Sequence, residues 1–151
     1  MANTQAMCTS FKTEVLSGIH ALGTTVIRAG TGADTIKAAL YLASATVNAA
    51  TTAYSAPGEV SGTGYTAGGV TATNATAPTS SGTTAYWTPS ASFTYTTVTL
   101  ATSFDCVLLY NSTQANKSIS AHTFGAQTIT AGTFVLSMPA NDASNALIRI
   151  A

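Results

Sequence analysis

Residues 59–69 read Glu-Val-Ser-Gly-Thr-Gly-Tyr-Thr-Ala-Gly-Gly, and we take this stretch as the organising centre of the fold. It contains one carboxylate, four glycines and one aromatic ring: Glu59, Gly62, Gly64, Tyr65, Gly68 and Gly69. Because glycine adopts backbone angles that other residues avoid, this density predicts a loop whose path the backbone dictates. Tyr65 could fix the loop by burying its ring and hydrogen-bonding its hydroxyl, and Glu59 could accept hydrogen bonds from loop amides. We expect a positive φ at one or more of Gly64, Gly68 and Gly69.

A phosphate-binding loop is the functional alternative for this stretch, and the residue spacing argues against it. A P-loop requires Lys followed by Ser or Thr after its last glycine, whereas Val70 follows Gly69. The dinucleotide-binding pattern also fails, because three other residues separate Gly64 from the next glycine. We therefore interpret the stretch as a structural loop and expect no cofactor there.

The chain carries very little charge. Of its 151 residues only 7% are charged, five basic and five acidic, so the formal net charge is zero. Five scattered Lys and Arg form neither the basic surface that nucleic acids require nor a polybasic membrane patch, and we expect neither partner. No run approaches the ~18 apolar residues of a membrane span, and the first residues lack the features of a signal peptide. A surface with so few charges is poorly protected against association, which favours a protein that belongs to a permanent assembly.

One amphipathic helix is expected at the N-terminus, from Thr4 to Leu22, with Gly23 as its stop. Apolar residues recur there at three- and four-residue steps, which is typical of a helix with one apolar face. The members of this stripe before Leu22 are Met7, Phe11, Val15 and Ile19. The stripe either packs on its own domain, as amphipathic helices usually do, or docks on a partner subunit. We take these four residues as candidate partner contacts and residues 1–23 as a helical segment that precedes the main domain.

From residue 24 onward the sequence predicts short strands separated by turns. Residues 104–110, Phe-Asp-Cys-Val-Leu-Leu-Tyr, form the most apolar run and predict a central strand buried on both faces. In residues 92–100 two aromatic and two aliphatic side chains fall on opposite faces, which predicts either a bulge or a strand that is covered on both faces. Further strands are expected at 25–28, 35–42, 70–76, 83–87, 119–124, 128–130, 133–138 and 146–151, with a hairpin across Ala131-Gly132 and turns at 78–82 and 111–116. This spacing predicts an all-β domain over residues 24–151, a β-sandwich of jelly-roll-like type with about eight strands.

The sequence shows no motif that would support catalysis or metal binding. The five carboxylates are spread along the chain, and no Ser lies in a Gly-x-Ser-x-Gly elbow. The two His and two Cys residues are not at metal-ligand spacing, and we expect Cys8 and Cys106 to be buried free thiols. Asp105 lies inside the most apolar run, so it must be paired or hydrogen-bonded. We therefore expect neither an enzyme nor a metal protein.

Three stretches and a lone tryptophan, taken in order, resemble a family of small virion proteins of tailed bacteriophages. They are Asp34-Thr35-Ile36-Lys37-Ala38-Ala39-Leu40-Tyr41, the loop at 59–69, Trp87 ahead of an aromatic strand, and Phe104-Asp105-Cys106-Val107-Leu108-Leu109-Tyr110-Asn111. The Gly-Tyr-Thr-Ala-Gly-Gly sequence at 64–69 is the most specific part. The resemblance covers residues 34–151, and the N-terminal segment departs from many members of the family.

The resemblance implies a β-rich particle component without enzyme activity. We expect a virion structural protein, made in the host bacterial cytoplasm, that decorates or cements the capsid shell. Its implied partners are copies of itself, in a dimer or trimer, and the major capsid protein or other virion proteins. Two alternatives stay open: a minor tail or head–tail connector protein, and a carbohydrate-binding module of a receptor-binding fibre. The second alternative would use four aromatic residues as its platform: Tyr54, Tyr65, Tyr86 and Trp87.

Overall fold

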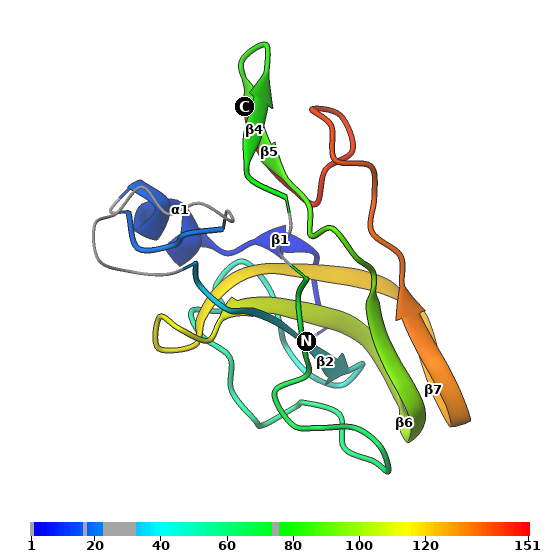
Figure 1. Ribbon diagram of the computed structural model, residues 1–151. Coiled ribbons are helices and arrows are strands. Elements are labelled where there is room, and N and C mark those ends of the chain that lie inside the picture. The colour runs from blue at the N-terminus through cyan, green and yellow to red at the C-terminus, as the bar shows by residue number, and fades with distance from the viewer. Residues whose placement is uncertain (1, 17, 23–32, 74–75) are drawn as a thin grey trace.

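The computed structural model describes residues 2–16, 18–22, 33–73 and 76–151, and nearly all of its regular elements are strands (Figure 1). In chain order they are β1 (Ala6–Met7), α1 (Thr9–Leu16), β2 (Ile36–Leu42), β3 (Val70–Thr71), β4 (Thr79–Ser81), β5 (Thr84–Trp87), β6 (Phe93–Asn111), β7 (Lys117–Leu136) and β8 (Ile148–Ile150). The strands form two antiparallel sheets, one of five strands in the order β1-β7-β6-β2-β3 and one of three in the order β4-β5-β8. The expectation of an all-β sandwich is confirmed.

The hydrophobic core is built around β6 and β2, the two most buried strands of the larger sheet. From Phe104 to Tyr110 every residue of β6 except Asp105 is buried, so the predicted central strand is confirmed. Continuous runs of apolar residues are typical of strands that are covered on both faces. Asp105 is half-buried and accepts a hydrogen bond from Asn3 Nδ2 at 2.6 Å, which explains how a carboxylate is tolerated there.

The strands β6 and β7 form a long two-stranded ribbon that is strongly curved (Figure 1). The pairing register of the two strands shifts at the bend. Two non-glycine residues there have left-handed backbone angles, Thr97 with φ 53° and Ala131 with φ 45°. The shift at Thr97 turns all four apolar side chains of residues 93–100 inward, as the predicted bulge requires: Phe93, Tyr95, Val98 and Leu100. The bend also places the Phe134 ring edge-on against the Phe104 ring, with centroids 5.1 Å apart.

The predicted hairpin across Ala131-Gly132 is wrong. Residues 128–130 and 133–136 do not pair with each other, because both belong to β7 and pair with β6 instead. Gly132 lies opposite Val98, at the bend of the ribbon. The Ala-Gly pair therefore marks a bend within one strand rather than a turn between two.

The N-terminal helix is much shorter than the sequence pattern predicts. Residues 6 and 7 form strand β1 along the edge of β7, and α1 covers only Thr9–Leu16. One local feature at each end of the helix accounts for the difference. Asn3 holds the chain extended by donating to the Leu42 carbonyl and accepting from the Val47 N–H, and Gly18 adopts φ 67° just after the helix. Hydrogen bonds to the sheet edge thus replace the first expected turns of the helix.

The remaining differences concern short elements. Residues 79–81, expected in a turn, form β4, with the turn itself at Gly82 before β5. Among the described residues of the expected strand 70–76, only Val70–Thr71 form a strand, β3. The turn expected at 111–116 is present at 112–116. The strand expected at 25–28 lies outside the described residues.

Candidate functional site

The loop at 59–69 is held by the carboxylate of Glu59, which accepts three hydrogen bonds. The Tyr54 hydroxyl donates to Oε2 at 2.6 Å, and the Tyr65 hydroxyl and the Gly68 N–H donate to Oε1, each at 2.7 Å. The Tyr65 hydroxyl also accepts from the Leu40 N–H at 3.1 Å, which ties the loop to β2. The anchoring roles predicted for Glu59 and Tyr65 are both confirmed.

The glycines of this loop allow its backbone to lie directly on the neighbouring strands. Gly64, Gly68 and Gly69 have φ values of 77°, 88° and 72°, so the expected positive φ is present at all three. A Cβ atom on Gly69 would lie 1.8 Å from the Ala38 carbonyl oxygen, and one on Gly62 would lie 2.0 Å from the Thr99 carbonyl oxygen. At Gly62, Gly64 and Gly69 a side chain would collide with the backbone of β2 or β6, whereas at Gly68 the left-handed φ is what favours glycine.

Tyrosine rings surround the Glu59 carboxylate and complete a structural cluster. Tyr54 stacks on Tyr110 with centroids 4.7 Å apart, and Tyr65 stacks on Tyr95 at 6.0 Å. Burial, together with the nearby Glu59 charge, raises the pKa of Tyr110 to about 12. Burial and the hydrogen bonds to Glu59 also raise the pKa values of Tyr54 and Tyr65. These phenols stay protonated at neutral pH and serve as hydrogen-bond donors.

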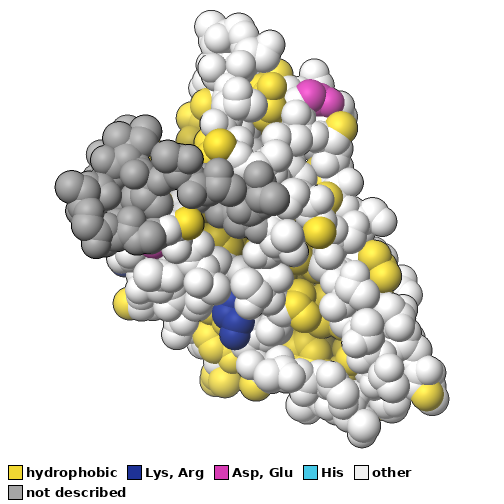
Figure 2. Space-filling model, viewed as in Figure 1, with side chains coloured by type: hydrophobic (Ala, Val, Ile, Leu, Met, Phe, Trp, Pro, Cys, Tyr) yellow, Lys and Arg dark blue, Asp and Glu magenta, His cyan; other side chains and the backbone are white. Residues whose placement is uncertain are grey.

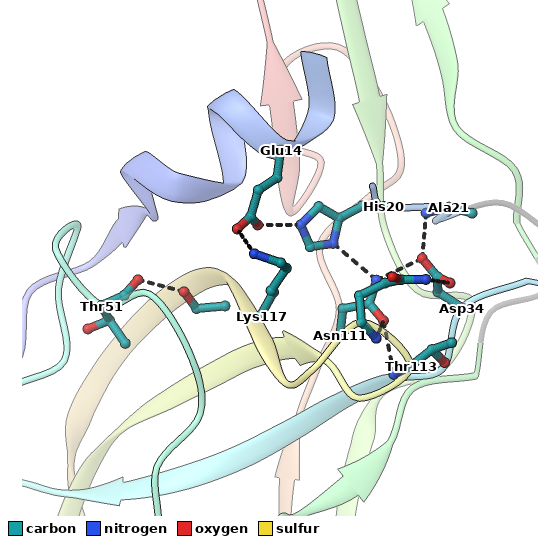
Figure 3. A network of polar contacts seen from close by, with 10 residues as sticks. Glu14, His20, Ala21, Asp34, Thr51, Asn111, Thr113 and Lys117 are labelled. Carbon is teal, nitrogen blue, oxygen red and sulfur yellow. Dashed lines mark hydrogen bonds and ion pairs between the residues drawn. The ribbon is translucent and has the colours of Figure 1, made fainter. Parts of the chain in front are cut away.

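A second polar network joins the N-terminal segment to the end of β6, as Figure 3 shows. His20 Nε2 lies 2.7 Å from Glu14 Oε2, and His20 Nδ1 lies 3.0 Å from Asn111 Nδ2. Asn111 Nδ2 also donates to Asp34 Oδ2 at 2.7 Å, and the same oxygen accepts from the Ala21 N–H at 2.7 Å. The network spans residues that are far apart in sequence, so it fastens the segment before β2 to the sheet.

The hydrogen-bond directions indicate the tautomer of His20. Asn111 Oδ1 accepts from the N–H groups of Thr113 and Gln114, both at 3.2 Å, so its Nδ2 must face His20 and Asp34. Because Nδ2 donates, His20 Nδ1 must present a lone pair, and the proton of the neutral ring lies on Nε2. The His20 side chain is 0% exposed and both ring nitrogens are occupied. The ring therefore acts as a bridge and not as an acid or base for a substrate.

Lys117 completes this network by pairing with the other oxygen of Glu14, at 2.6 Å. Burial by itself would raise the pKa of Glu14, but the hydrogen bonds from Lys117 and His20 outweigh that effect and hold the pKa below its ordinary value. Glu14 is therefore ionised at neutral pH, with both of its oxygens engaged.

The candidate partner contacts do not form one exposed stripe. Phe11 is 0% exposed and lies in the core of its own domain, so it offers no surface to a partner. Met7 and Val15 are partly buried against the same core, and Ile19 is half-buried. The apolar stripe thus covers the chain's own sheet, the alternative that amphipathic helices usually follow.

The two cysteines, Cys8 and Cys106, are buried free thiols, as expected. Burial raises the pKa of Cys106 to about 12 and lowers the pKa of His122 to about 4. His122 Nε2 lies 2.9 Å from Ser120 Oγ. Within the described part of the chain, no three His, Cys, Asp or Glu side chains come together in a group that could hold a metal ion.

Sequence reasoning missed the network around Asn111 and the tyrosine partners of Glu59. The available signals were Asn111 at the end of the most apolar run and Asp34 directly before a strand. Polar residues at strand ends are common, so the sequence did not show that Asn111 and Asp34 would be hydrogen-bonding partners.

Comparison with family models, with curated proteins and with solved structures gave no match. The structure also contains, among its described residues, no helix with the length and apolar character needed to cross a membrane.

Proposed function

We propose that this protein is a structural component of the virion of a tailed bacteriophage, one that decorates or cements the capsid shell. The resemblance of residues 34–151 to small phage virion proteins motivates the proposal. The observation that carries it is the near absence of charge on a folded β-sandwich.

The surface is even poorer in charge than the composition suggests. Two of the five carboxylates, Glu14 and Asp34, are buried, and few charged side chains are visible on the face in Figure 2. Among the described residues, two large apolar side chains are exposed, Val135 at 47% and Ile150 at 46%. Short side chains such as Ala, Ser and Thr lose little rotamer freedom when they are covered. A surface of this kind supports permanent association with a shell, through a dimer or trimer of the protein.

The glycan-binding alternative is less well supported by the aromatic residues. The Trp87 ring is 1% exposed, and its Nε1 donates to the Thr76 carbonyl at 3.0 Å. Tyr54 and Tyr65 are stacked on other tyrosines and donate to Glu59. Rings that are packed and hydrogen-bonded in this way do not present open faces to a sugar.

The deciding experiment adds the purified protein to phage heads that lack it and images the particles by electron microscopy. We expect density for this chain at local symmetry axes of the shell. Binding should change little between about 50 and 500 mM salt, because few charges are available to be screened. Density in the tail alone would favour the tail or connector alternative, and a monomer without affinity for heads would refute decoration.

A matched pair of variants tests the surface argument. Val135→Glu places a charge on an exposed apolar residue of β7 and should weaken head binding. Thr79→Glu, at an exposed position of β4, adds the same charge elsewhere and serves as the control. Equal binding by wild type, variant and control would remove Val135 from the contact surface.

A further inference from the structure

His20 joins the end of the N-terminal segment to the end of β6 through contacts that fit only its neutral ring. Nε2 donates to Glu14 Oε2 at 2.7 Å, and Nδ1 accepts from Asn111 Nδ2 at 3.0 Å (Figure 3). A protonated imidazole carries an N–H on both nitrogens and has no lone pair. Protonation of His20 therefore sets its Nδ1–H against an N–H of Asn111, two donors without an acceptor between them.

Asn111 cannot relieve this conflict by turning its amide over. Its Oδ1 accepts from the N–H groups of Thr113 and Gln114, both at 3.2 Å. Its Nδ2 also donates to Asp34 Oδ2 at 2.7 Å. Half a turn of the amide would gain one hydrogen bond and lose these three, since it would place the NH₂ group against two donors and the oxygen against a carboxylate. The contact between His20 and Asn111 must therefore break when the ring takes up a proton.

The charges around the imidazole allow it to be protonated once it has left Asn111. Burial by itself would raise the pKa of Glu14, but the hydrogen bonds from Lys117 and from the imidazole hold that pKa below its ordinary value, so the carboxylate stays ionised in mild acid. Lys117 binds the other Glu14 oxygen at 2.6 Å, and the Phe11 ring packs edge-on against the imidazole with centroids 4.8 Å apart. Asp34 lies on the far side of Asn111. The protonated ring thus keeps its ion pair with Glu14 and loses its contact to the sheet.

Breaking this contact loosens one end of the N-terminal segment and leaves the other end in place. The Ala21 N–H donates to Asp34 Oδ2 at 2.7 Å, the oxygen that Asn111 also binds, so this bond depends on the same cluster. The start of the segment is held separately, because the Cys8 N–H donates to a β7 carbonyl at 3.0 Å.

The loosened end forms part of the wall of an apolar pocket of about 240 Å³. His20 and Leu22 line this pocket from the N-terminal segment, and Trp87 and Ile148 line it from the three-stranded sheet. Movement of residues 18–22 away from β6 would widen the pocket and expose its apolar side chains to solvent.

We propose that His20 is an acid-sensitive switch, whose protonation separates residues 18–22 from the end of β6 and opens the apolar pocket while β1 stays paired with β7. Histidine is the side chain whose charge ordinarily changes between pH 5 and 8. The switch depends on contacts within this chain alone, so it is independent of the virion proposal.

The test measures hydrogen exchange of the full chain, labelled with ¹⁵N, by NMR between about pH 7.5 and 5.5. Each rate is divided by the intrinsic exchange rate at the same pH, so that only changes in protection are compared. Protection of the Ala21 amide should fall by about tenfold for each pH unit below the midpoint, because opening takes up one proton. Protection of the Cys8 amide should not change. Fluorescence of the apolar dye ANS should rise over the same range.

The chain has two histidines, so two single substitutions separate their effects. His122→Gln leaves His20 as the one histidine, and the loss of Ala21 protection should persist with the midpoint at which the His20 ring nitrogens titrate. His20→Gln removes the titrating group and should abolish the pH dependence. If that variant does not fold, agreement of the two midpoints in His122→Gln decides. Constant Ala21 protection in wild type, an equal loss at Cys8, two different midpoints, or pH dependence that persists in His20→Gln would each overturn the proposal.

Discussion

Substitution of Gly69 by Ala should destabilise the protein more than any other single glycine substitution in the loop. The new Cβ would lie 1.8 Å from the Ala38 carbonyl oxygen and 2.7 Å from Ala39 Cα, which are backbone atoms of β2 that cannot rotate away. The φ of 72° adds a cost of about 1–2 kcal/mol for a residue with a side chain. Separating the loop from the strand adds about 1–3 kcal/mol, as overpacking in cores does. We therefore expect a loss of about 2–5 kcal/mol in the free energy of unfolding.

Gly82 provides the matched control for this substitution. Its φ of 59° is also left-handed, but a Cβ there would meet nothing within 4 Å. Gly82→Ala should therefore cost only the backbone term, about 1 kcal/mol. Urea denaturation of both variants measures the two losses on the same scale. If Gly69→Ala loses no more stability than Gly82→Ala, the close approach of the loop to β2 does not matter, and the reasoning fails.

Three further predictions follow from the polar and titratable groups. Glu59→Gln should cost about 1–3 kcal/mol in a urea melt, because three partly buried donors then share one acceptor oxygen; a wild-type melt would contradict the anchoring role. Because the pKa of His122 is about 4 in the fold against 6.5 unfolded, stability should be full above pH 6.5 and fall by about 3 kcal/mol toward pH 4. His122→Gln should flatten that fall, and an unchanged pH profile would exclude His122 as its source. Burial and the raised pKa of Cys106 predict no reaction of the native protein with a thiol reagent at pH 8, whereas the unfolded chain should show two thiols.

The glycine loop could be predicted because its determinants are local in sequence. Glu59, Tyr65 and Gly68 lie within ten residues of one another. In a loop, glycine supplies left-handed backbone angles, a tyrosine hydroxyl donates a hydrogen bond and a carboxylate accepts hydrogen bonds, so each role could be assigned from the residue type. The central strand from Phe104 to Tyr110 could be predicted for a similar reason, since an apolar run buried on both faces is a property of the segment itself.

The His20 network could not be predicted, because it depends on contacts across long stretches of chain. Asn111 lies 91 positions from His20, and Lys117 lies 103 positions from Glu14. The periodicity of the sequence does not indicate which strand end the N-terminal segment will contact.

The error at Ala131-Gly132 has a different cause. Local turn chemistry indicated a reversal between two strands, but pairing with β6 keeps both sides of Ala131-Gly132 in one strand, which bends there without reversing. Pairing with another segment thus overrode the local preference.

The fastening of the N-terminal segment has a consequence for synthesis on the ribosome. Residues 2–22 leave the ribosome before their partners on β6 and β7, which are made about a hundred residues later, a delay of about 5–20 s at ordinary elongation rates. During that time Phe11 has no core to enter, and its apolar side chain faces solvent. The ribbon of β6 and β7, whose turn at 112–116 closes a short loop, can form as soon as it emerges. Residues 2–22 are therefore translated before β6 and β7 but dock after them.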